Sequence, residues 1–323
     1  MGLPEPLQRV LAGRPVVLDG QTLAVDTQLV LRMQRLSRMP GAETLPIDEA
    51  RELVLHQTRV TSPTQPIGAV RDLEVAGRPA RLYTPTDPGR GLMVFFHGGG
   101  FVYGDLDSHD AACRFQAERS GARVLAVDYR LGPEHPFPAP YDDVLAAYEW
   151  TVDNAASLGA DPTRLAVGGD SAGANLAAVT SIEAARRGWP LAFQLLVYPT
   201  TDCARDTRSL ELFGEGFYLT KRFIQVANEG YLPPGMDLRD PRVSPLHADL
   251  PAGLAPALLV TAGFDPLRDE GEAYARKMVE AGATVELKRF PEQIHGFFNI
   301  LVAGSRSRAA NAEIAARLRG ALH

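Results

Sequence analysis

One serine in the chain stands where a catalytic nucleophile would. Residues 164–179, RLAVGGDSAGANLAAV, begin as a short apolar strand, turn through glycines around Ser171 and continue as an alanine-rich helix. A serine between a buried strand and a helix must adopt strained backbone angles, so the residues two positions away must be small, and here they are Gly169 and Gly173. A serine N-cap in a glycine-rich turn would alone be the commoner explanation of so short a pattern. Ser171 is therefore a candidate nucleophile that needs partners elsewhere.

The chain offers a general base and an acid in suitable places. An alcohol is a poor nucleophile at neutral pH, so Ser171 would need a base within reach and a group that orients this base. His295 follows the last predicted strand and precedes Gly296, while Asp265 ends the strand before it. The order serine, aspartate, histidine is expected when the nucleophile lies on a strand-to-helix elbow. Asp269 is a rival acid, but a place in the first turn of a helix explains it better through the helix dipole.

Three consecutive glycines follow the apolar strand 92–96. They belong to the segment HGGGFVYG, residues 97–104. Consecutive glycines let the backbone pass close to a ligand and aim its N–H groups inward, which suggests an anion pocket. A flexible loop would explain the glycines but not why His97 and Phe101 bracket them. A phosphate loop has no support, because the sequence carries neither G-K-[ST] nor a G-x-G-x-x-G that opens a helix.

The elements around these residues predict an α/β fold. After a hairpin that turns near Gly77, strands alternate with helices and the chain closes with a helix rich in alanine and arginine. Such alternation predicts a mostly parallel sheet with right-handed crossovers, whose active sites form at the carboxyl ends of strands. Besides the strand before Ser171, the predicted elements are strands 92–96, 123–129, 193–198, 256–265 and 284–289, and helices 109–119, 141–156 and 270–281.

Two segments break the alternation. Residues 1–50 show helical apolar spacing among prolines and charges, which predicts helical cover and no sheet. Residues 203–240 cluster aromatic side chains among glycines and charges. We predict that these two segments form the two parts of a helical cap, and that residues 51–202 and 241–323 form the catalytic core. An ordinary long loop is the alternative for residues 203–240, although it would be unusual at this length.

Composition excludes several classes of protein. The 323 residues are 45% hydrophobic and 22% charged, which suits one large core with a lid. A net charge of -6 offers no basic excess for nucleic acid or anionic lipid, and no stretch approaches membrane-spanning length. The first residues, with early prolines and an acid, contain no apolar run of signal-peptide length, so a cytoplasmic location is expected.

The cysteines and histidines give no support for a metal site. Cys113 and Cys203 are too few for a disulfide scaffold or a metal cluster, and two buried thiols are expected. The seven histidines show neither H-E-x-x-H nor a spacing shared with cysteine. We therefore expect no metal and no cofactor.

Five motifs carry a resemblance to known proteins: HGGGF at 97–101, DYRLGPEHPFPA at 128–139, GDSAG at 169–173, DPLRD at 265–269 and HGF at 295–297. Together they resemble the hormone-sensitive-lipase family of α/β-hydrolase esterases, in the branch with the Gly-Asp-Ser-Ala-Gly elbow. One departure is Gly132, where the family usually has alanine.

The resemblance implies an α/β-hydrolase fold: a mostly parallel sheet flanked by helices, with a helical cap. It implies a serine carboxylesterase for short- to medium-chain esters that forms an acyl-enzyme and needs no cofactor. Ser171 would be the nucleophile, His295 the general base and then acid, and Asp265 the residue that orients His295. The resemblance also implies an oxyanion hole of three backbone N–H groups, those of Gly98, Gly99 and Ala172.

Other functions and partners stay open at this point. Receptors similar to this family bind small molecules without catalysis, but they lose the histidine that stands here as His295. Amide or peptide hydrolysis by the same residues is a second alternative, and a purely structural role would leave the strained serine without a purpose. We expect a small-molecule ester as partner, no nucleic acid and no stable membrane insertion. A homodimer is possible through the edge strand 284–289, whose charged residues could equally protect the edge of a monomer.

Overall fold

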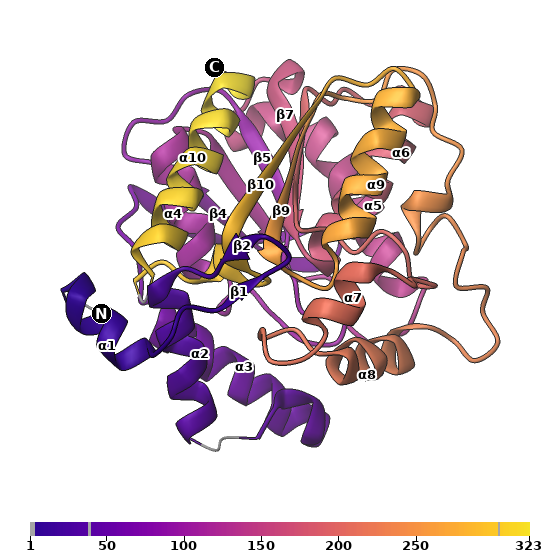
Figure 1. Cartoon of the computed structure of the whole chain (residues 1–323). Coiled ribbons are helices and arrows are strands. Elements are labelled where there is room, and N and C mark those ends of the chain that lie inside the picture. Colours follow the sequence, from indigo (N-terminus) through magenta and orange to yellow (C-terminus); the bar gives the residue numbers. More distant parts are fainter. Residues whose placement is uncertain (1–3, 38–39, 303) are drawn as a thin grey trace.

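In the computed structural model, which describes residues 4–37, 40–302 and 304–323, an eight-stranded sheet runs through the centre of the protein (Figure 1). Its strand order is β10-β9-β8-β7-β5-β6-β4-β3, and the five pairs from β10 to β6 are parallel, whereas β4 pairs antiparallel with both β6 and β3. The predicted α/β class with a mostly parallel sheet is confirmed. The strands are β3 (Ala69–Val75), β4 (Arg78–Thr84), β5 (Leu92–Phe96), β6 (Arg123–Val127), β7 (Leu165–Asp170), β8 (Phe193–Val197), β9 (Ala257–Phe264) and β10 (Val285–Ile294).

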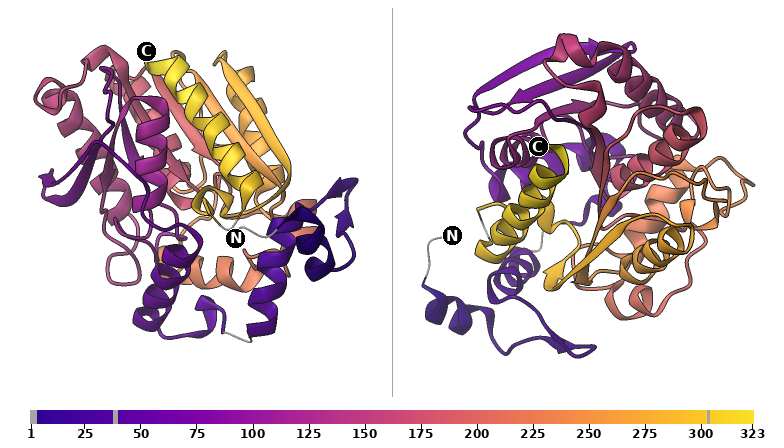
Figure 2. Two further views of the ribbon diagram at one scale, coloured as in Figure 1. Left: turned by 90° about the vertical axis from the view of Figure 1, so that its left-hand side faces the viewer. Right: turned by 90° about the horizontal axis from the view of Figure 1, so that it is seen from above.

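Helices cover both faces of this sheet, as the two views in Figure 2 also show. One face carries α4 (Asp110–Ser120) and α10 (Ser305–Leu322), and the other carries α5 (Ala139–Asn154), α6 (Ala172–Arg187) and α9 (Arg268–Glu280). All five residues of β5 are buried, and successive side chains enter opposite faces, since Phe96 joins the core beside α5 and α6 while Phe95 joins the core beside α4 and α10. This burial on both faces explains why the central strands read as continuous apolar runs.

The predicted hairpin and strand-helix alternation are confirmed, with small shifts of element ends. The hairpin joins β3 to β4 through Ala76 and Gly77, which both have positive φ angles. Such a two-residue turn follows the right-handed twist of the paired strands. The predicted edge strand 284–289 is β10, which runs further, to Ile294, and lies at one edge of the sheet.

The prediction that residues 1–50 contain no sheet is wrong in one place. Strands β1 (Val17–Leu18) and β2 (Gln21–Thr22) form a small antiparallel hairpin. Asp19 and Gly20 make its turn with φ angles of 54° and 73°. Asp-Gly is a strong hairpin signal, and it outweighed the helical spacing around it.

The helices outside the sheet layers gather near the carboxyl ends of the parallel strands (Figure 1). They are α2 (Val25–Ser37), α3 (Ile47–Thr61), α7 (Arg208–Phe213) and α8 (Lys221–Tyr231), while α1 (Glu5–Ala12) packs on α2. The two predicted cap segments touch one another, because the Thr220 hydroxyl at the start of α8 donates to Glu43 at 3.0 Å. The cap limits stay a prediction: α3 continues across residue 50, and residues 1–3 and 38–39 lie outside the described residues.

Gly132, the departure from the family motifs, lies against the cap. A Cβ atom at this position would collide with the backbone oxygen of Gly230 in α8. The missing methyl group therefore lets α8 approach this loop closely.

Both cysteines are free and buried, as predicted, with Cys113 in α4 and Cys203 after β8. Burial raises the pKa of both thiols. Within the described ranges, none of the helices combines the length and the apolar composition needed to cross a bilayer.

The packing of α6 against β5 gives a testable prediction. A Cβ on Gly173 would collide with the backbone oxygens of Phe96 and His97, so Gly173→Ala is expected to lower the free energy of unfolding by about 2 kcal/mol or more, as measured by urea denaturation. Gly320→Ala in α10, where a Cβ meets open space, is the control and is expected to change stability by less than about 1 kcal/mol. Equal stability of the two variants would contradict the close approach.

Candidate active site

Four parallel strands deliver the predicted site residues to one edge of the sheet. Ser171 directly follows β7, Asp265 follows β9 and His295 follows β10, while the three glycines come just after β5. Because the carboxyl ends of parallel strands meet at the same edge, residues far apart in the chain become neighbours there. The order and direction of the strands therefore bring the predicted site residues together.

Ser171 has the strained backbone expected of a strand-to-helix elbow. Its φ and ψ angles are 56° and -117°, an unusual region for a residue with a side chain. The buried strand β7 precedes it and α6 starts at the next residue, while the Ser171 N–H donates to Val197 of β8 at 2.9 Å. Packing on both sides holds the serine at the top of the turn.

The structure brings Ser171, His295 and Asp265 together in one chain of hydrogen bonds. His295 Nε2 lies 2.9 Å from Ser171 Oγ, and His295 Nδ1 lies 2.8 Å from Asp265 Oδ2. Asp265 is fully buried, and its other oxygen accepts the Leu267 N–H at 2.8 Å. With Nδ1–H donating to Asp265, His295 Nε2 is left free to accept the proton of the serine hydroxyl.

The rival acid, Asp269, is engaged elsewhere. One of its oxygens accepts the Ser209 N–H at 2.8 Å, and the other pairs with Arg268 at 2.9 Å. It lies in the first turn of α9, where a negative charge suits the helix dipole. The acid that contacts His295 is Asp265.

The prediction of Gly98 as an oxyanion donor needs correction. The Gly98 N–H donates to Asp170 Oδ1 at 2.9 Å, so this donor is already engaged. Within the described parts of the chain, the N–H groups of Gly99, Gly100 and Ala172 have no hydrogen-bond acceptor, and all three residues line cavities that include Ser171. Gly100, which the sequence reasoning left out, therefore replaces Gly98 as the candidate donor beside Gly99 and Ala172.

Asp170, next to Ser171, holds several parts of the site together. Besides the Gly98 N–H, it accepts from Tyr198 Oη at 3.2 Å and Asn299 Nδ2 at 3.3 Å, and it lies 3.2 Å from His109 Nε2. Burial alone would raise the pKa of Asp170, but the neighbouring His109 ring and the Gly98 N–H hold it below its ordinary value. No local pattern around Asp170 points to this role, because its partners come from distant segments.

His97 and Phe101 anchor the two ends of the glycine loop. The His97 ring stacks on Tyr129 with centroids 4.3 Å apart, and the Tyr129 hydroxyl donates to the His97 carbonyl at 2.7 Å. Phe101 stacks on Tyr231 of α8 with centroids 3.9 Å apart. These contacts explain why the two residues bracket the glycines.

Two cavities meet at Ser171. The larger, of about 300 Å³, is also lined by His295, Gly99 and the cap residues Leu31 and Tyr218. The smaller, of about 30 Å³, is bounded by Ala172, Thr200, Arg205 and residues of α8. Among the residues that the structure describes, no group of three or more His, Cys, Asp or Glu side chains is placed to hold a metal ion.

Known proteins show the same organisation. A protein family described as having the alpha/beta hydrolase fold matches residues 93–299. The chain is 43% identical to the carboxylic ester hydrolase LipN of Mycobacterium tuberculosis, over 99% of this chain and 89% of that protein. It is 35% identical to the ethyl acetate hydrolase of Pseudomonas putida, over 86% and 91% of the two chains.

A solved structure gives the same result. The hyperthermophilic esterase from the archaeon Pyrobaculum calidifontis is 36% identical and superposes with a TM-score of 0.87, covering 92% of this chain and 98% of that one. The two proteins are therefore similar in sequence as well as in fold.

His97 gives a prediction for the pH dependence of stability. Burial lowers its pKa from 6.5 to about 4, so the unfolded chain takes up this proton at a higher pH than the folded chain does. The stability that depends on a neutral His97 is thus fully present above pH 6.5. As the pH falls from 6.5 towards 4, the free energy of unfolding decreases by about 1.4 kcal/mol per pH unit. His97→Gln should show a smaller loss of unfolding free energy between pH 7 and 4.5, measured by urea denaturation. His56→Gln, at an exposed position of α3, should keep the loss of the parent protein, and an unchanged loss in His97→Gln would contradict the prediction.

Asp170 gives a second prediction. Asp170→Asn puts an amide donor in place of one carboxylate oxygen, where the present donors then lack an acceptor. We expect unfolding free energy to fall by about 1–3 kcal/mol, and kcat for ester hydrolysis to fall more than KM rises, since the glycine loop loses its anchor. Asp87→Asn, an exposed position, should change stability by less than about 0.5 kcal/mol. A fully stable and active Asp170→Asn protein would show that the anchor is dispensable.

Proposed function

Because the chain belongs to the hormone-sensitive-lipase branch of the α/β-hydrolase family and is a carboxylic ester hydrolase, we propose that it cleaves esters through a catalytic triad of Ser171, His295 and Asp265. The observation that carries this proposal is the position of His295, 2.9 Å from Ser171 Oγ on one side and 2.8 Å from Asp265 on the other. The strained elbow supports it further, since strain of this kind collects at functional sites.

The proposed reaction passes through an acyl-enzyme. His295 accepts the hydroxyl proton of Ser171 as its oxygen attacks the ester carbonyl carbon, and a tetrahedral intermediate forms. His295 then gives the proton to the leaving alcohol, and the C–O bond to the alcohol breaks. Water attacks the acyl-enzyme with the same assistance, which releases the acid and restores Ser171. Asp265 stabilises the imidazolium that exists during both halves.

An oxyanion hole of Gly99, Gly100 and Ala172 N–H groups would stabilise both tetrahedral intermediates. Ala172 opens α6, so its N–H has no acceptor within the helix. Charge develops on the carbonyl oxygen only in the intermediate, and fixed donors aimed at it typically supply a factor of about 100 to 1,000 each.

The two cap segments would enclose the substrate. Leu31 and Ala42 come from the N-terminal segment and Phe223 from α8, and all three line the larger cavity. A cavity of about 300 Å³ with such walls suits esters of short to medium chain length and is small for a triglyceride. The contact of Thr220 with Glu43 supports a cap built from both segments.

A non-catalytic receptor of this fold is the weaker alternative. A receptor needs a closed pocket but no base, and here His295 lies in hydrogen-bond distance of Ser171. Peptide hydrolysis by the same residues finds no specific support in the cavity walls.

Nucleophile and base can be tested with 4-nitrophenyl esters of increasing acyl length. Ser171→Ala and His295→Ala should each lower kcat by about a million-fold, because members of a triad act as one unit. Ser157→Ala, an exposed hydroxyl, should stay within about twofold of the parent enzyme. A fluorophosphonate should label the parent protein once, at the peptide that contains Ser171. Folded parent protein that binds esters without cleaving them, or a Ser171→Ala variant that stays active, would overturn the proposal.

A further inference from the structure

Arg205 lies buried beside the nucleophile, although the proposed reaction does not use it. Its side chain is 5% exposed, and that of its partner Glu270 is fully buried. Together with Ser171 and Ala172, Arg205 lines the smaller of the two cavities. A buried charged group at this place calls for an explanation.

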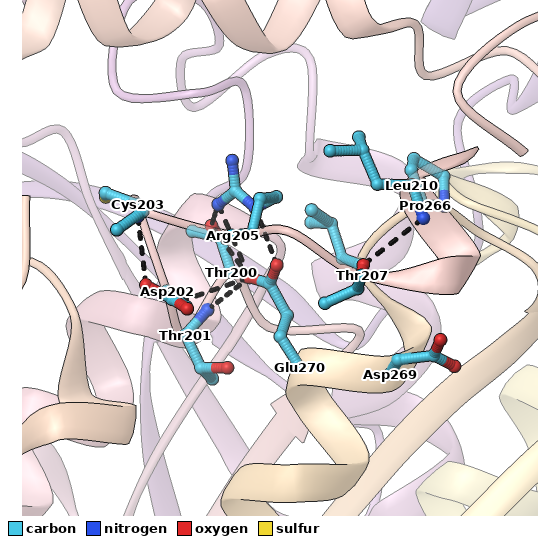
Figure 3. A network of polar contacts seen from close by, with 12 residues as sticks. Thr200, Thr201, Asp202, Cys203, Arg205, Thr207, Leu210, Pro266, Asp269 and Glu270 are labelled. Atoms are coloured by element: carbon cyan, nitrogen blue, oxygen red, sulfur yellow. Dashed lines mark hydrogen bonds and ion pairs between the residues drawn. The ribbon is translucent and has the colours of Figure 1, made fainter.

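Two of the three guanidinium nitrogens have partners within the chain (Figure 3). Nε donates to Glu270 Oε2 at 2.6 Å, and Nη2 donates to Thr200 Oγ1 and, at 3.3 Å, to Glu270 Oε1. In the described structure no residue accepts a hydrogen bond from Nη1. Figure 3 shows this third nitrogen, without a dashed line, on the side of Arg205 that faces away from Glu270.

The ion pair between Arg205 and Glu270 forms through Nε and Nη2, without Nη1. Glu270 Oε1 also accepts the backbone N–H groups of Thr201 and Asp202, at 2.8 and 3.2 Å, and the Thr200 hydroxyl at 3.4 Å. Together with Arg205 Nε and Nη2, these contacts let Glu270 hold the segment after β8. Nη1 itself is not fully buried, because the described side-chain atoms that are both fully buried and unpaired do not include it. It is therefore open to an acceptor on a ligand in the smaller cavity, which Arg205 lines.

The position of His295 decides which part of an ester would enter the smaller cavity. The leaving alcohol must receive its proton from His295 Nε2, and His295 lines only the larger cavity of these two. The alcohol thus fits the larger cavity, and the acyl chain fits the smaller one. A volume of about 30 Å³ would hold about two water molecules, which corresponds to two or three atoms beyond the carbonyl carbon.

We propose that the smaller cavity is an acyl subsite in which Arg205 Nη1 donates a hydrogen bond to an oxygen atom of the acyl chain. The enzyme would then prefer short acyl groups that carry a neutral oxygen acceptor close to the carbonyl carbon, such as alkoxy, hydroxy or keto groups. This inference rests on the proposed function, since it requires an acyl group on Ser171.

A neutral acceptor suits the site better than a carboxylate. Arg205 and Glu270 already neutralise one another, and a second buried carboxylate would add a negative charge without a counter-ion. An ether or carbonyl oxygen can accept the hydrogen bond without this cost.

A pair of substrates with the same shape tests the proposal. 4-Nitrophenyl methoxyacetate and 4-nitrophenyl butyrate differ only in one oxygen that replaces a CH₂ group. The ratio of their kcat/KM values is divided by the ratio of their rates with hydroxide, which removes the difference in intrinsic reactivity. The parent enzyme should show a normalised ratio of about ten or more, as expected for a hydrogen bond from a charged donor. A ratio near one would overturn the proposal.

Arg205→Lys asks whether Arg205 is the source of this preference. Lysine keeps a positive charge opposite Glu270 but lacks the guanidinium fork, so the normalised ratio should fall about tenfold while butyrate hydrolysis changes less. Arg208→Lys is the matched control, because Arg208 lies three residues further on and is mostly exposed. An equal loss for both esters in Arg205→Lys would mean a structural role only and would overturn the proposal.

Two results keep this test separate from the proposed function. If Ser171→Ala stays active, the proposed function fails. If Ser171→Ala is inactive and the parent enzyme shows no preference for methoxyacetate, only the acyl subsite fails. Should Arg205→Lys not fold, the ratio measured for the parent enzyme still decides.

Discussion

The backbone of Ser171 is the constraint on which the rest of the site depends. A residue with a side chain keeps a φ of 56° only if its surroundings hold it there. Here α6 packs so closely on the sheet that Gly173 lies against the backbone of Phe96, the last residue of the neighbouring strand β5. The same close approach places the start of α6, with its free Ala172 N–H, beside the glycine loop that follows β5. The strained backbone of Ser171 and the group of free backbone donors beside it are thus two consequences of one contact.

Asp170 extends this arrangement from the elbow to its surroundings. It is the last residue of β7, so its position is as fixed as that of Ser171. Its carboxylate engages Gly98 in the glycine loop and Asn299 in the segment after His295. Asp170, beside Ser171, therefore links the glycine loop of the proposed oxyanion hole to the loop that carries His295. Because Gly98 is engaged, the free donors shift one residue along the loop, to Gly99 and Gly100.

Sequence patterns predicted the strands, their alternation with helices and the three residues of the hydrogen-bonded chain, because each of these depends on local signals. Ser171 lies between two glycines, and Asp265 and His295 each end a strand. The engaged state of Gly98 depends on Asp170, 72 residues away, and no local pattern reports that contact. The small β1–β2 hairpin was missed although its Asp-Gly turn was legible, because the helical spacing on either side was given more weight. The buried position of Arg205 could not be predicted from the segment around it, because it depends on the ion pair with Glu270 in a distant helix.

The ion pair of Arg205 and Glu270 connects the proposed acyl subsite to Asp265. Glu270 lies in the first turn of α9, five residues after Asp265, so the helix that begins behind the acid also holds the segment after β8. That segment forms one wall of the smaller cavity through Thr200 and Arg205. A change of acyl specificity at this wall would therefore act on the packing of α9, and through α9 on the position of Asp265 and the orientation of His295. Substitutions that keep a charge opposite Glu270 leave this connection intact, whereas those that remove the charge leave a buried carboxylate with too few partners.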